Sequence, residues 1–378
     1  MIRLERRTSQ PRWLSVAVPV GSLIVAFAIM AVVLLASGHD PWSTYRKLVE
    51  AGFTGNGALS ATLISATPIL FTGLAAAVAF RMELFNIGAE GQLYLGAVGG
   101  AWIALQLGDR DAGSTAVYVV AMCVAAAVTG ALWALIPGVL RAFANTNEII
   151  TSLMLNYVAG YLLTYLIFSS SSYWRDTSTL QARAFPQGKP MPPAAEWPTF
   201  GSSVVLPLGF VVGLGVAVVL WVLYARTRFG FEVSVIADSP RAARYAGMRT
   251  RRKILAVMAL SGAVAGLGGA SQIGDFTHTL DGSPQGLQAA AFGYTGIVVA
   301  ALARYNPFAV CLVAVLLGGL LNAGFTLQGV DFPSGLVGVM QGIILFCALG
   351  GELLIRYRIR FPRRTRVTTD GEATPEAV

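Results

Sequence analysis

The sequence predicts an all-α, polytopic integral membrane protein with about ten transmembrane helices. Of its 378 residues, 55% are hydrophobic and only 12% are charged. A soluble domain has about 25% charged residues, so this composition provides too little polar surface for a chain of this length in water. Several apolar runs also approach the roughly 20 residues that a helix needs to cross a bilayer.

Ten apolar runs are candidate spans. They cover residues 14–36, 58–80, 86–106, 115–140, 149–168, 204–225, 254–273, 286–303, 308–326 and 335–354. We expect the first run to be an uncleaved span, because it is too long for a signal peptide and no small-residue cleavage site is evident. The junction between the second and third runs is the least regular, because Arg81, Glu83 and Glu90 interrupt it.

Lysine and arginine concentrate in alternate segments between these runs. Six of the 27 basic residues lie in the segments that would face outward: Arg46, Lys47, Arg110, Arg175, Arg183 and Lys189. The others lie in segments on the opposite side, and such a bias marks the cytoplasmic face. We therefore expect cytoplasmic N-terminal (1–13) and C-terminal (355–378) tails around a membrane domain at 14–354. The end of the chain, after Arg366, has the composition of a disordered segment.

The one long outer segment, 169–203, combines five prolines with several aromatic residues. Proline prevents continuous helix, and exposed aromatic side chains favour contact surfaces. Two interpretations are open. The segment either docks an external partner or forms an ordered loop that covers the outer ends of the spans.

The inner segment 226–253 is strongly basic and lies between two apolar runs. Its eight basic residues are Arg226, Arg228, Arg241, Arg244, Arg249, Arg251, Arg252 and Lys253. An arginine at the bilayer centre costs about 2.5 to 3.5 kcal/mol, so this segment cannot lie in lipid. We expect a structured aqueous segment on the cytoplasmic side.

Within that segment, residues 240–246 are predicted to form a short coupling helix. Ser239 can cap its free amides, Pro240 suits its first turn, and Gly247 suits the left-handed position that ends a helix. The alanines provide a smooth face shaped for a groove on a partner protein. The residues assigned to this docking surface are Asp238, Ser239, Pro240, Ala242, Ala243, Tyr245, Ala246 and Gly247. The alternative is a basic loop held against anionic lipid headgroups, to which residues 249–253 also contribute.

The motifs of common enzymes are missing. A phosphate-binding loop needs Gly-Lys before Ser or Thr, but Pro190 follows the only Gly-Lys pair, at Lys189. The two histidines, His39 and His278, are too far apart for a zinc site of the usual spacing. No catalytic, metal-binding or cofactor-binding residue is therefore predicted. Nucleic-acid binding is a poor interpretation because the basic residues flank spans.

Two groups of polar residues lie within apolar runs. Asn86, Glu90 and Gln92 stand among glycines, which allow non-helical backbone only where protein or a water-filled cavity surrounds it. They either line a substrate path or form a cytoplasmic turn in which Glu90 pairs with Arg81 or a neighbouring helix.

A second polar group recurs every four residues and therefore shares one helix face. It begins with Glu148, Ser152 and Asn156, and Gly160 and Thr164 continue it. Such a stripe either lines a path for a hydrophilic solute or hydrogen-bonds to other helices. The alternative for Glu148, at the inner edge, is simple contact with water. The candidate translocation path is Asn86, Glu90, Gln92, Glu148, Ser152 and Asn156.

The run at 254–273 contains small residues that also recur every four positions. Gly262, Gly266 and Ala270 form one row, and Ser261, Ala265 and Gly269 form another. Small residues at this spacing let helix backbones approach closely. We predict close packing here and no contact with solute.

Four sequence stretches carry a family resemblance. They are LFNIGAEGQLYLGA (84–97), NEIITSLMLNYVAGYL (147–162), ADSPRAARYAGM (237–248) and GYTGIVVAALARYNP (293–307). From about residue 58 to 354 the chain resembles permease subunits of ATP-binding-cassette (ABC) importers, in the branch of ribose, branched-chain amino acid and nucleoside permeases. It is most similar to the nucleoside permeases. The outer segment 169–203 and the acidic C-terminal end lie outside the shared pattern.

The resemblance implies a non-enzymatic transport subunit in a bacterial cytoplasmic membrane. Its solute would be a nucleoside or, alternatively, a simple sugar. The implied partners are a cytoplasmic ATPase that binds ATP and magnesium, a second homologous permease and an external substrate-binding lipoprotein. The 240–246 helix would transmit movement of the ATPase.

Two rival functions remain. An ion-coupled secondary transporter would need an essential carboxylate within the membrane, for which Glu90 is the only plausible candidate, and no internal repeat is evident. A membrane-embedded enzyme would need clustered catalytic polar residues, which the sequence does not present.

Overall fold

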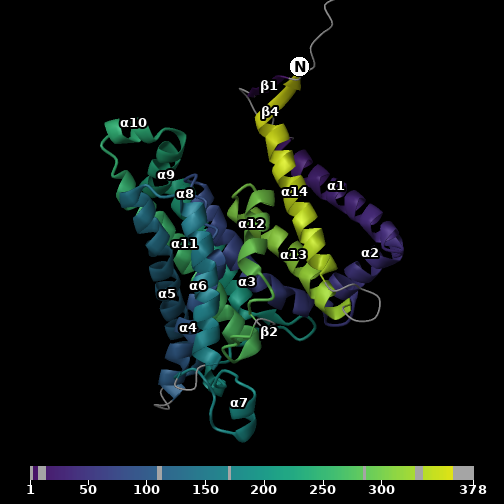
Figure 1. The fold of residues 1–378 in the computed structure, drawn as a ribbon, viewed down its shortest axis with the longest axis vertical. Coiled ribbons are helices and arrows are strands. Elements are labelled where there is room, and N and C mark those ends of the chain that lie inside the picture. The colour runs from purple at the N-terminus through teal and green to yellow at the C-terminus, as the bar shows by residue number, and fades with distance from the viewer. Residues whose placement is uncertain are drawn as a thin grey trace, which may run out of the picture.

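The computed structural model describes residues 3–6, 14–108, 113–168, 172–283, 287–327 and 335–360. These residues form a mostly helical membrane protein, which confirms the predicted all-α class (Figure 1). The predicted disorder after Arg366 lies outside the described residues.

Each of the ten predicted spans contains a helix. They are α1 (Leu14–Ala36), α3 (Ala58–Phe80), α4 (Ala89–Gly108), α5 (Thr115–Ala144), α6 (Glu148–Phe168), α8 (Leu208–Arg226), α11 (Thr250–Gln272), α12 (Phe292–Leu302), α13 (Pro307–Leu327) and α14 (Leu336–Arg356). Within the described part of the chain, seven of the helices are long and apolar enough to cross a membrane: α1, α3, α5, α6, α8, α11 and α13. The chain is therefore a multi-pass membrane protein.

The helix α12 differs from its prediction. The apolar run at 286–303 suggested a full span, but α12 has 11 residues. At 1.5 Å per residue it is about 16 Å long, roughly half the thickness of the hydrocarbon core. Residues 287–291, which precede it, are not helical.

Shorter elements connect the long helices. They are α2 (Pro41–Val49), η1 (Glu50–Thr54), α7 (Leu180–Ala184), η2 (Pro193–Ala195), α9 (Arg228–Asp238), α10 (Pro240–Tyr245) and η3 (Ile273–Thr277), with the strands β1 (Arg3–Arg6), β2 (Thr199–Phe200), β3 (Leu206–Pro207) and β4 (Tyr357–Arg360). β2 pairs with β3, and β1 pairs antiparallel with β4, with Arg3 opposite Arg360.

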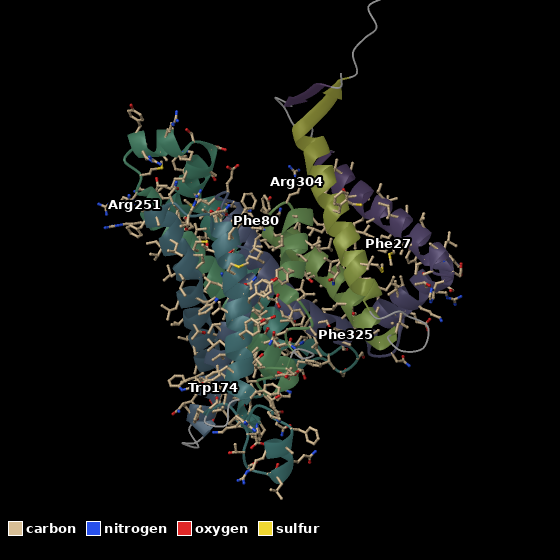
Figure 2. The ribbon with its side chains drawn as sticks, viewed as in Figure 1. Phe27, Phe80, Trp174, Arg251, Arg304 and Phe325 are labelled. Carbon is tan, nitrogen blue, oxygen red and sulfur yellow. The ribbon has the colours of Figure 1, made fainter. Side chains whose placement is uncertain are left out.

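The β1–β4 pair lies at the same end of the molecule as α10, and α7 lies at the opposite end (Figure 1). Arg251 and Arg304 lie toward the α10 end and Trp174 toward the α7 end (Figure 2). Both ends of the described chain therefore share a side with the basic segment, as the charge distribution predicted. That this side is cytoplasmic remains a prediction from the same distribution.

The helices α3, α4 and α11 form the centre of the bundle. α3 is buried along almost its entire length. By contrast, α1, α5, α6 and α8 each present an apolar face to their surroundings. Apolar side chains on the outside of a helical bundle are expected where lipid replaces water as the solvent.

Glycines allow α11 to approach α5 closely. A Cβ atom on Gly266 would lie 2.2 Å from the carbonyl oxygen of Ala126, and one on Gly262 would lie 2.4 Å from that of Gly130. Gly96 of α4 meets Gly266 from another side, with an added Cβ 2.3 Å from the Gly266 carbonyl oxygen. The predicted close packing of this small-residue row is confirmed.

The outer segment packs against the ends of the helices. The Met191 amide donates to the carbonyl of His278 and the Trp197 amide to that of Gly274, both at 2.9 Å. Trp197 is buried, whereas Phe185 is 73% exposed. Of the two interpretations, the structure supports an ordered covering loop, and its exposed side chains still leave a surface free for a partner.

Replacing Gly266 by alanine is expected to lower stability by about 1 to 3 kcal/mol, because the new methyl group would overlap backbone atoms of α5. The matched control is Gly215→Ala on α8, where an added Cβ meets nothing within 4 Å. Thermal unfolding of the purified protein in detergent should show a lower Tm for the Gly266 variant only. Equal Tm values for both variants would contradict the close contact.

Candidate functional site

Two non-helical segments interrupt the membrane bundle. The first joins α3 to α4 at residues 81–88, and the second leads into α12 at residues 287–291. Backbone N–H and C=O groups cannot find water in the bilayer core, so the surrounding protein must provide hydrogen bonds for them. The polar residues of the predicted stripes provide many of these bonds.

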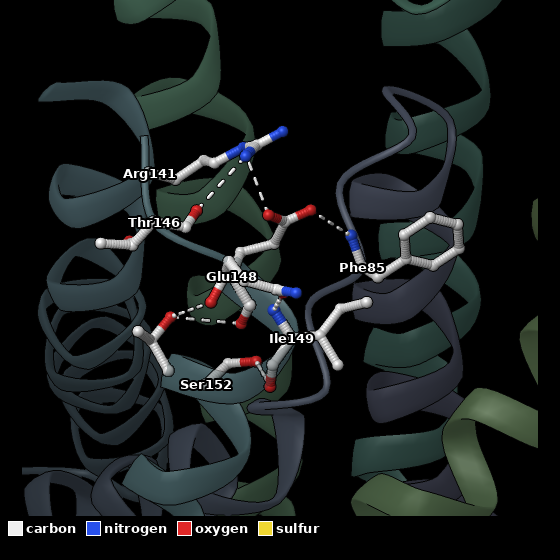
Figure 3. A network of polar contacts seen from close by, with 8 residues as sticks. Phe85, Arg141, Thr146, Glu148, Ile149 and Ser152 are labelled. Carbon is white, nitrogen blue, oxygen red and sulfur yellow. Dashed lines mark hydrogen bonds and ion pairs between the residues drawn. The ribbon is translucent and has the colours of Figure 1, made fainter. Parts of the chain in front are cut away.

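The polar stripe of α6 holds the first segment. Asn156 accepts from the Gly91 amide at 2.9 Å and donates to the Ile87 carbonyl at 2.8 Å. Ser152 accepts from the Ile87 amide at 3.2 Å, and Glu148 accepts from the Phe85 amide at 3.4 Å (Figure 3). Three side chains, one per helical turn, therefore bind successive backbone groups of the broken segment.

Glu148 also joins α6 to the end of α5. Its carboxylate forms an ion pair with Arg141 at 3.2 Å, and Arg141 donates to the Thr146 carbonyl at 3.3 Å (Figure 3). Glu148 is only 5% exposed. The interpretation in which it simply reaches water is therefore wrong, because the Arg141 guanidinium and the Phe85 amide replace water around it.

Asn86 joins the broken segment to α4, α11 and α3. Its amide exchanges two hydrogen bonds with the Gln92 amide, at 3.0 and 2.9 Å, and donates to the Ser261 hydroxyl at 2.9 Å. Ser261 donates in turn to the Ala75 carbonyl at 2.7 Å. Asn86 and Ser261 are fully buried. The sequence showed Ser261 only as a small packing residue, so its polar role was missed.

Glu90 binds the start of the half-length helix α12. One carboxylate oxygen accepts from the Tyr94 hydroxyl at 2.6 Å, and the other accepts from the Gly293 amide. Ala291, at the N-cap of α12, has no side chain that could cap the helix. A carboxylate from α4 therefore satisfies a helix start, where the helix dipole also favours negative charge.

The predicted pairing of Glu90 with Arg81 is wrong, although its pairing with a neighbouring helix is confirmed. Arg81 donates to the Tyr305 carbonyl at 3.1 and 2.9 Å and lies over the Tyr224 ring at 4.8 Å. The turn at 82–88 separates the two side chains, since Arg81 follows the end of α3 and Glu90 begins α4.

The outer half of the α6 stripe binds the second segment. Gln288 donates to the Thr164 hydroxyl at 3.0 Å and to the Gly160 carbonyl at 3.3 Å. Thr164 donates to the Gly282 carbonyl at 3.1 Å. The single stripe on α6 therefore binds both breaks in the bundle. Gln288 was missed because the sequence suggested an uninterrupted span there.

The six candidate path residues are thus brought together around the two breaks. Each is buried, with exposures of 0 to 5%. Of the two interpretations of the α6 stripe, the structure shows the hydrogen-bonding one. Lining of a solute path by these residues stays a prediction, and it requires a conformation in which the breaks open.

The basic segment 226–253 contains two consecutive helices, α9 and α10, which together are called the α9–α10 hairpin. Ser239 ends α9 and caps α10 by accepting from the Ala242 amide at 3.3 Å, and Gly247 has a φ of 74°. The predicted caps of this helix are confirmed. The helix α9 was not predicted from the sequence, and Asp238, assigned to the docking surface, is its last residue.

One residue of the predicted docking surface faces inward. Ala243 is fully buried, so its place on the outward alanine face is wrong. Ala243 is buried because the chain turns back from α10 toward α11. In this turn the Met248 amide donates to the Ala243 carbonyl at 3.0 Å. Tyr245, by contrast, is 97% exposed, and Ala242 and Ala246 are exposed beside it.

Glu90→Leu leaves two groups without a hydrogen-bond partner, the Gly293 amide and the Tyr94 hydroxyl. The free energy of unfolding is expected to fall by about 1 to 3 kcal/mol for each of them, which a lower Tm would show. Glu90→Gln keeps an acceptor and a hydrogen-bonding partner at this position and should remain near the wild-type Tm. Glu196→Leu, at an exposed carboxylate of the outer loop, is the control. A Glu90→Leu variant with the wild-type Tm would contradict the role of Glu90 at the start of α12.

Comparison with known proteins places these features in a family. A family model described as "Branched-chain amino acid transport system / permease component" matches residues 58–349. No solved structure matches the chain.

Three curated relatives align over nearly their whole length. The chain is 34% identical to the glucose ABC transporter permease protein TsgB13 of Haloferax volcanii, covering 96% of this chain and 95% of the relative. It is 33% identical to the guanosine ABC transporter permease protein NupP of Bacillus subtilis, covering 91% and 94%. It is 28% identical to the nucleoside ABC transporter permease protein NupB of Lactococcus lactis, covering 88% and 90%. The chain therefore belongs to the family of branched-chain amino acid transport system permease components.

Proposed function

We propose that this chain is the permease subunit of an ABC importer that moves a nucleoside across the cytoplasmic membrane of a bacterium. The observation that carries the proposal is the combination of a multi-pass helical bundle with an exposed capped helix, α10, at its basic end. The near full-length similarity to the guanosine and nucleoside permeases supports the substrate class.

The proposed route of energy runs from α10 into the bundle. No phosphate-binding loop occurs in the sequence, so ATP hydrolysis belongs to a partner ATPase. Lys253 at the start of α11 forms a 2.7 Å ion pair with Glu232 of α9, which ties the hairpin to α11. Movement of α10 would then reach Ser261 on α11 and, through it, Asn86 at the first break.

The proposed path follows the two breaks. Non-helical backbone within a membrane protein commonly lines a solute site, because its free N–H and C=O groups can bind the solute. In this proposal the α6 stripe releases some backbone groups of residues 85–91 when the bundle opens. Asn86, Glu90, Gln92, Glu148, Ser152 and Asn156 would then contact the solute or its hydration water.

A simple sugar is the second candidate substrate. It is favoured by the similarity to the glucose permease TsgB13, which is 34% identical over 96% of this chain. Assembly with a second homologous permease and an external binding lipoprotein completes the proposal for either substrate. The exposed side chains of the outer loop, such as Phe185, are the proposed contact for the binding protein.

Deletion of the gene in its native host is expected to abolish high-affinity uptake of radiolabelled guanosine while glucose uptake stays unchanged. Initial uptake rates for both solutes, with and without a plasmid copy of the gene, provide the measurement. Loss of glucose uptake with unchanged guanosine uptake would support the sugar candidate instead. Uptake that followed an ion gradient and ignored internal ATP would contradict an ABC importer.

Tyr245→Asp is expected to reduce solute-stimulated ATP hydrolysis at least tenfold, because it places a negative charge on an almost fully exposed side chain of α10. The assay uses the whole importer reconstituted in vesicles. Tyr245→Phe keeps the ring and is the matched control, with expected activity near wild type. Since Tyr245 makes no packing contact inside the chain's core, the Tm of both variants should be unchanged. Full activity of Tyr245→Asp would exclude α10 as the docking helix.

A further inference from the structure

A pocket of about 940 Å³ opens beside α10. It lies between the end of α5, the turn that follows α3, the α9–α10 hairpin and the start of α11. It therefore lies at the basic end of the molecule, and the proposed transport function gives this pocket no role. Its size is in the range of pockets that hold small molecules or lipid headgroups.

Positive charge dominates the lining of this pocket. Its charged residues are Arg141, Arg244, Arg249, Arg251, Arg252 and Glu83. Arg141 is already paired with Glu148, and Arg251 lies over the ring of Phe143 at 5.4 Å. In the part of the chain that the structure describes, Arg244, Arg249 and Arg252 have no ion pair or side-chain hydrogen bond. Several like charges thus face one space, and in the described residues none of these three arginines is ion-paired with Glu83, the carboxylate of the lining.

The start of α11 also lines this pocket. Arg249 occupies the N-cap position and provides no side-chain acceptor for the first turn of this 23-residue helix. The hydroxyl of Thr250 is buried and has no hydrogen-bond partner among the described residues. The Thr250 amide donates to the Met248 carbonyl at 3.0 Å, and the buried Thr250 hydroxyl is not open to the pocket. The helix dipole still favours an anion at this helix start.

An apolar surface leads from the membrane to the pocket. Phe143 lines the pocket and is 61% exposed, and Val139, one turn earlier on α5, is 43% exposed. Both side chains lie on the outward face of a helix that spans the membrane. An acyl chain can follow this face while its headgroup occupies the pocket. Basic pockets of this kind, at the cytoplasmic ends of transmembrane helices, bind anionic headgroups.

We propose that the pocket lined by Arg244, Arg249 and Arg252 binds a phosphate-bearing anion that pairs with these arginines. The apolar approach along α5 favours an anionic phospholipid as its source, and a soluble phosphate compound shares the same recognition chemistry. Guanidinium groups bind phosphate through paired, charge-assisted hydrogen bonds.

The anion would stabilise the position of the coupling helix. Arg244 belongs to α10, whereas Arg249 and Arg252 belong to the start of α11. Without a counterion these like charges repel one another, and an anion between them would convert repulsion into attraction. The anion therefore acts as an electrostatic clamp between α10 and α11.

The test measures ligand binding to the purified full-length chain and does not depend on transport. The chain is placed in phosphatidylcholine nanodiscs, and either phosphatidylglycerol or inorganic pyrophosphate is added. Native mass spectrometry then measures binding of the added ligand, and the Tm measures the stability of the protein. The pocket variant is Arg249→Gln/Arg252→Gln. The matched control, Arg226→Gln/Arg228→Gln, removes two charges from the same segment but outside the pocket.

For the pocket variant, we expect the apparent affinity for phosphatidylglycerol to fall about thirtyfold, the loss typical of two basic residues at an anionic surface. The control should retain wild-type affinity. If pyrophosphate binds and its binding also depends on Arg249 and Arg252, the anion site is supported and its natural ligand is a soluble phosphate compound. Equal losses in both variants, or no saturable binding of either ligand by the wild type, would overturn the proposal. In phosphatidylcholine alone, a Tm of the pocket variant at or above the wild-type value would verify that it is folded, because removing two like charges reduces their repulsion.

Discussion

The need to satisfy backbone polar groups inside a bilayer is the constraint on which this structure depends. The chain breaks helical continuity between α3 and α4 and again before α12, where water cannot replace the lost hydrogen bonds. One helix, α6, binds both breaks: Ser152 and Asn156 hold the first, and Thr164 helps to hold the second. Glu90 then binds the free start of α12. Without these side chains the breaks would cost several kcal/mol for each unsatisfied group.

This arrangement connects the first break to the basic end of the molecule through α11. Glycines of α11 bring its backbone into close contact with the backbones of α5 and α4. Its Ser261 bonds Asn86 at the first break, and its first residues continue from the α9–α10 hairpin. Interfaces packed as tightly as these have few alternative arrangements, and small displacements are therefore transmitted as discrete shifts. The helix α11 is thus the proposed lever between the partner ATPase and the solute path.

Sequence patterns predicted much of this arrangement because they record local requirements. The ten apolar runs located ten helices, the Ser239–Pro240 pair and Gly247 located the ends of α10, and the small-residue row of α11 located its closest contact. Spacing every four residues also brought Glu148, Ser152 and Asn156 onto one face. Hydrogen-bond partners that are far apart in the sequence could not be predicted in this way. Glu90 accepts a hydrogen bond from Gly293, 203 positions away in the sequence, and no local pattern predicts such a pair.

The sequence by itself determined the membrane class, the places of the ten long apolar segments, the caps of α10 and the expected orientation, because hydropathy, capping and charge bias act over a few residues each. Only the tertiary structure decided that α12 is a half-length helix and that Ala243 faces inward. It also decided that Glu90 binds the start of α12, while Arg81 donates to the Tyr305 carbonyl. An apolar run has the same composition whether it is helical or held in a non-helical form by its neighbours. Which of the two it becomes depends on hydrogen bonds from distant side chains, and these exist only once the bundle has assembled.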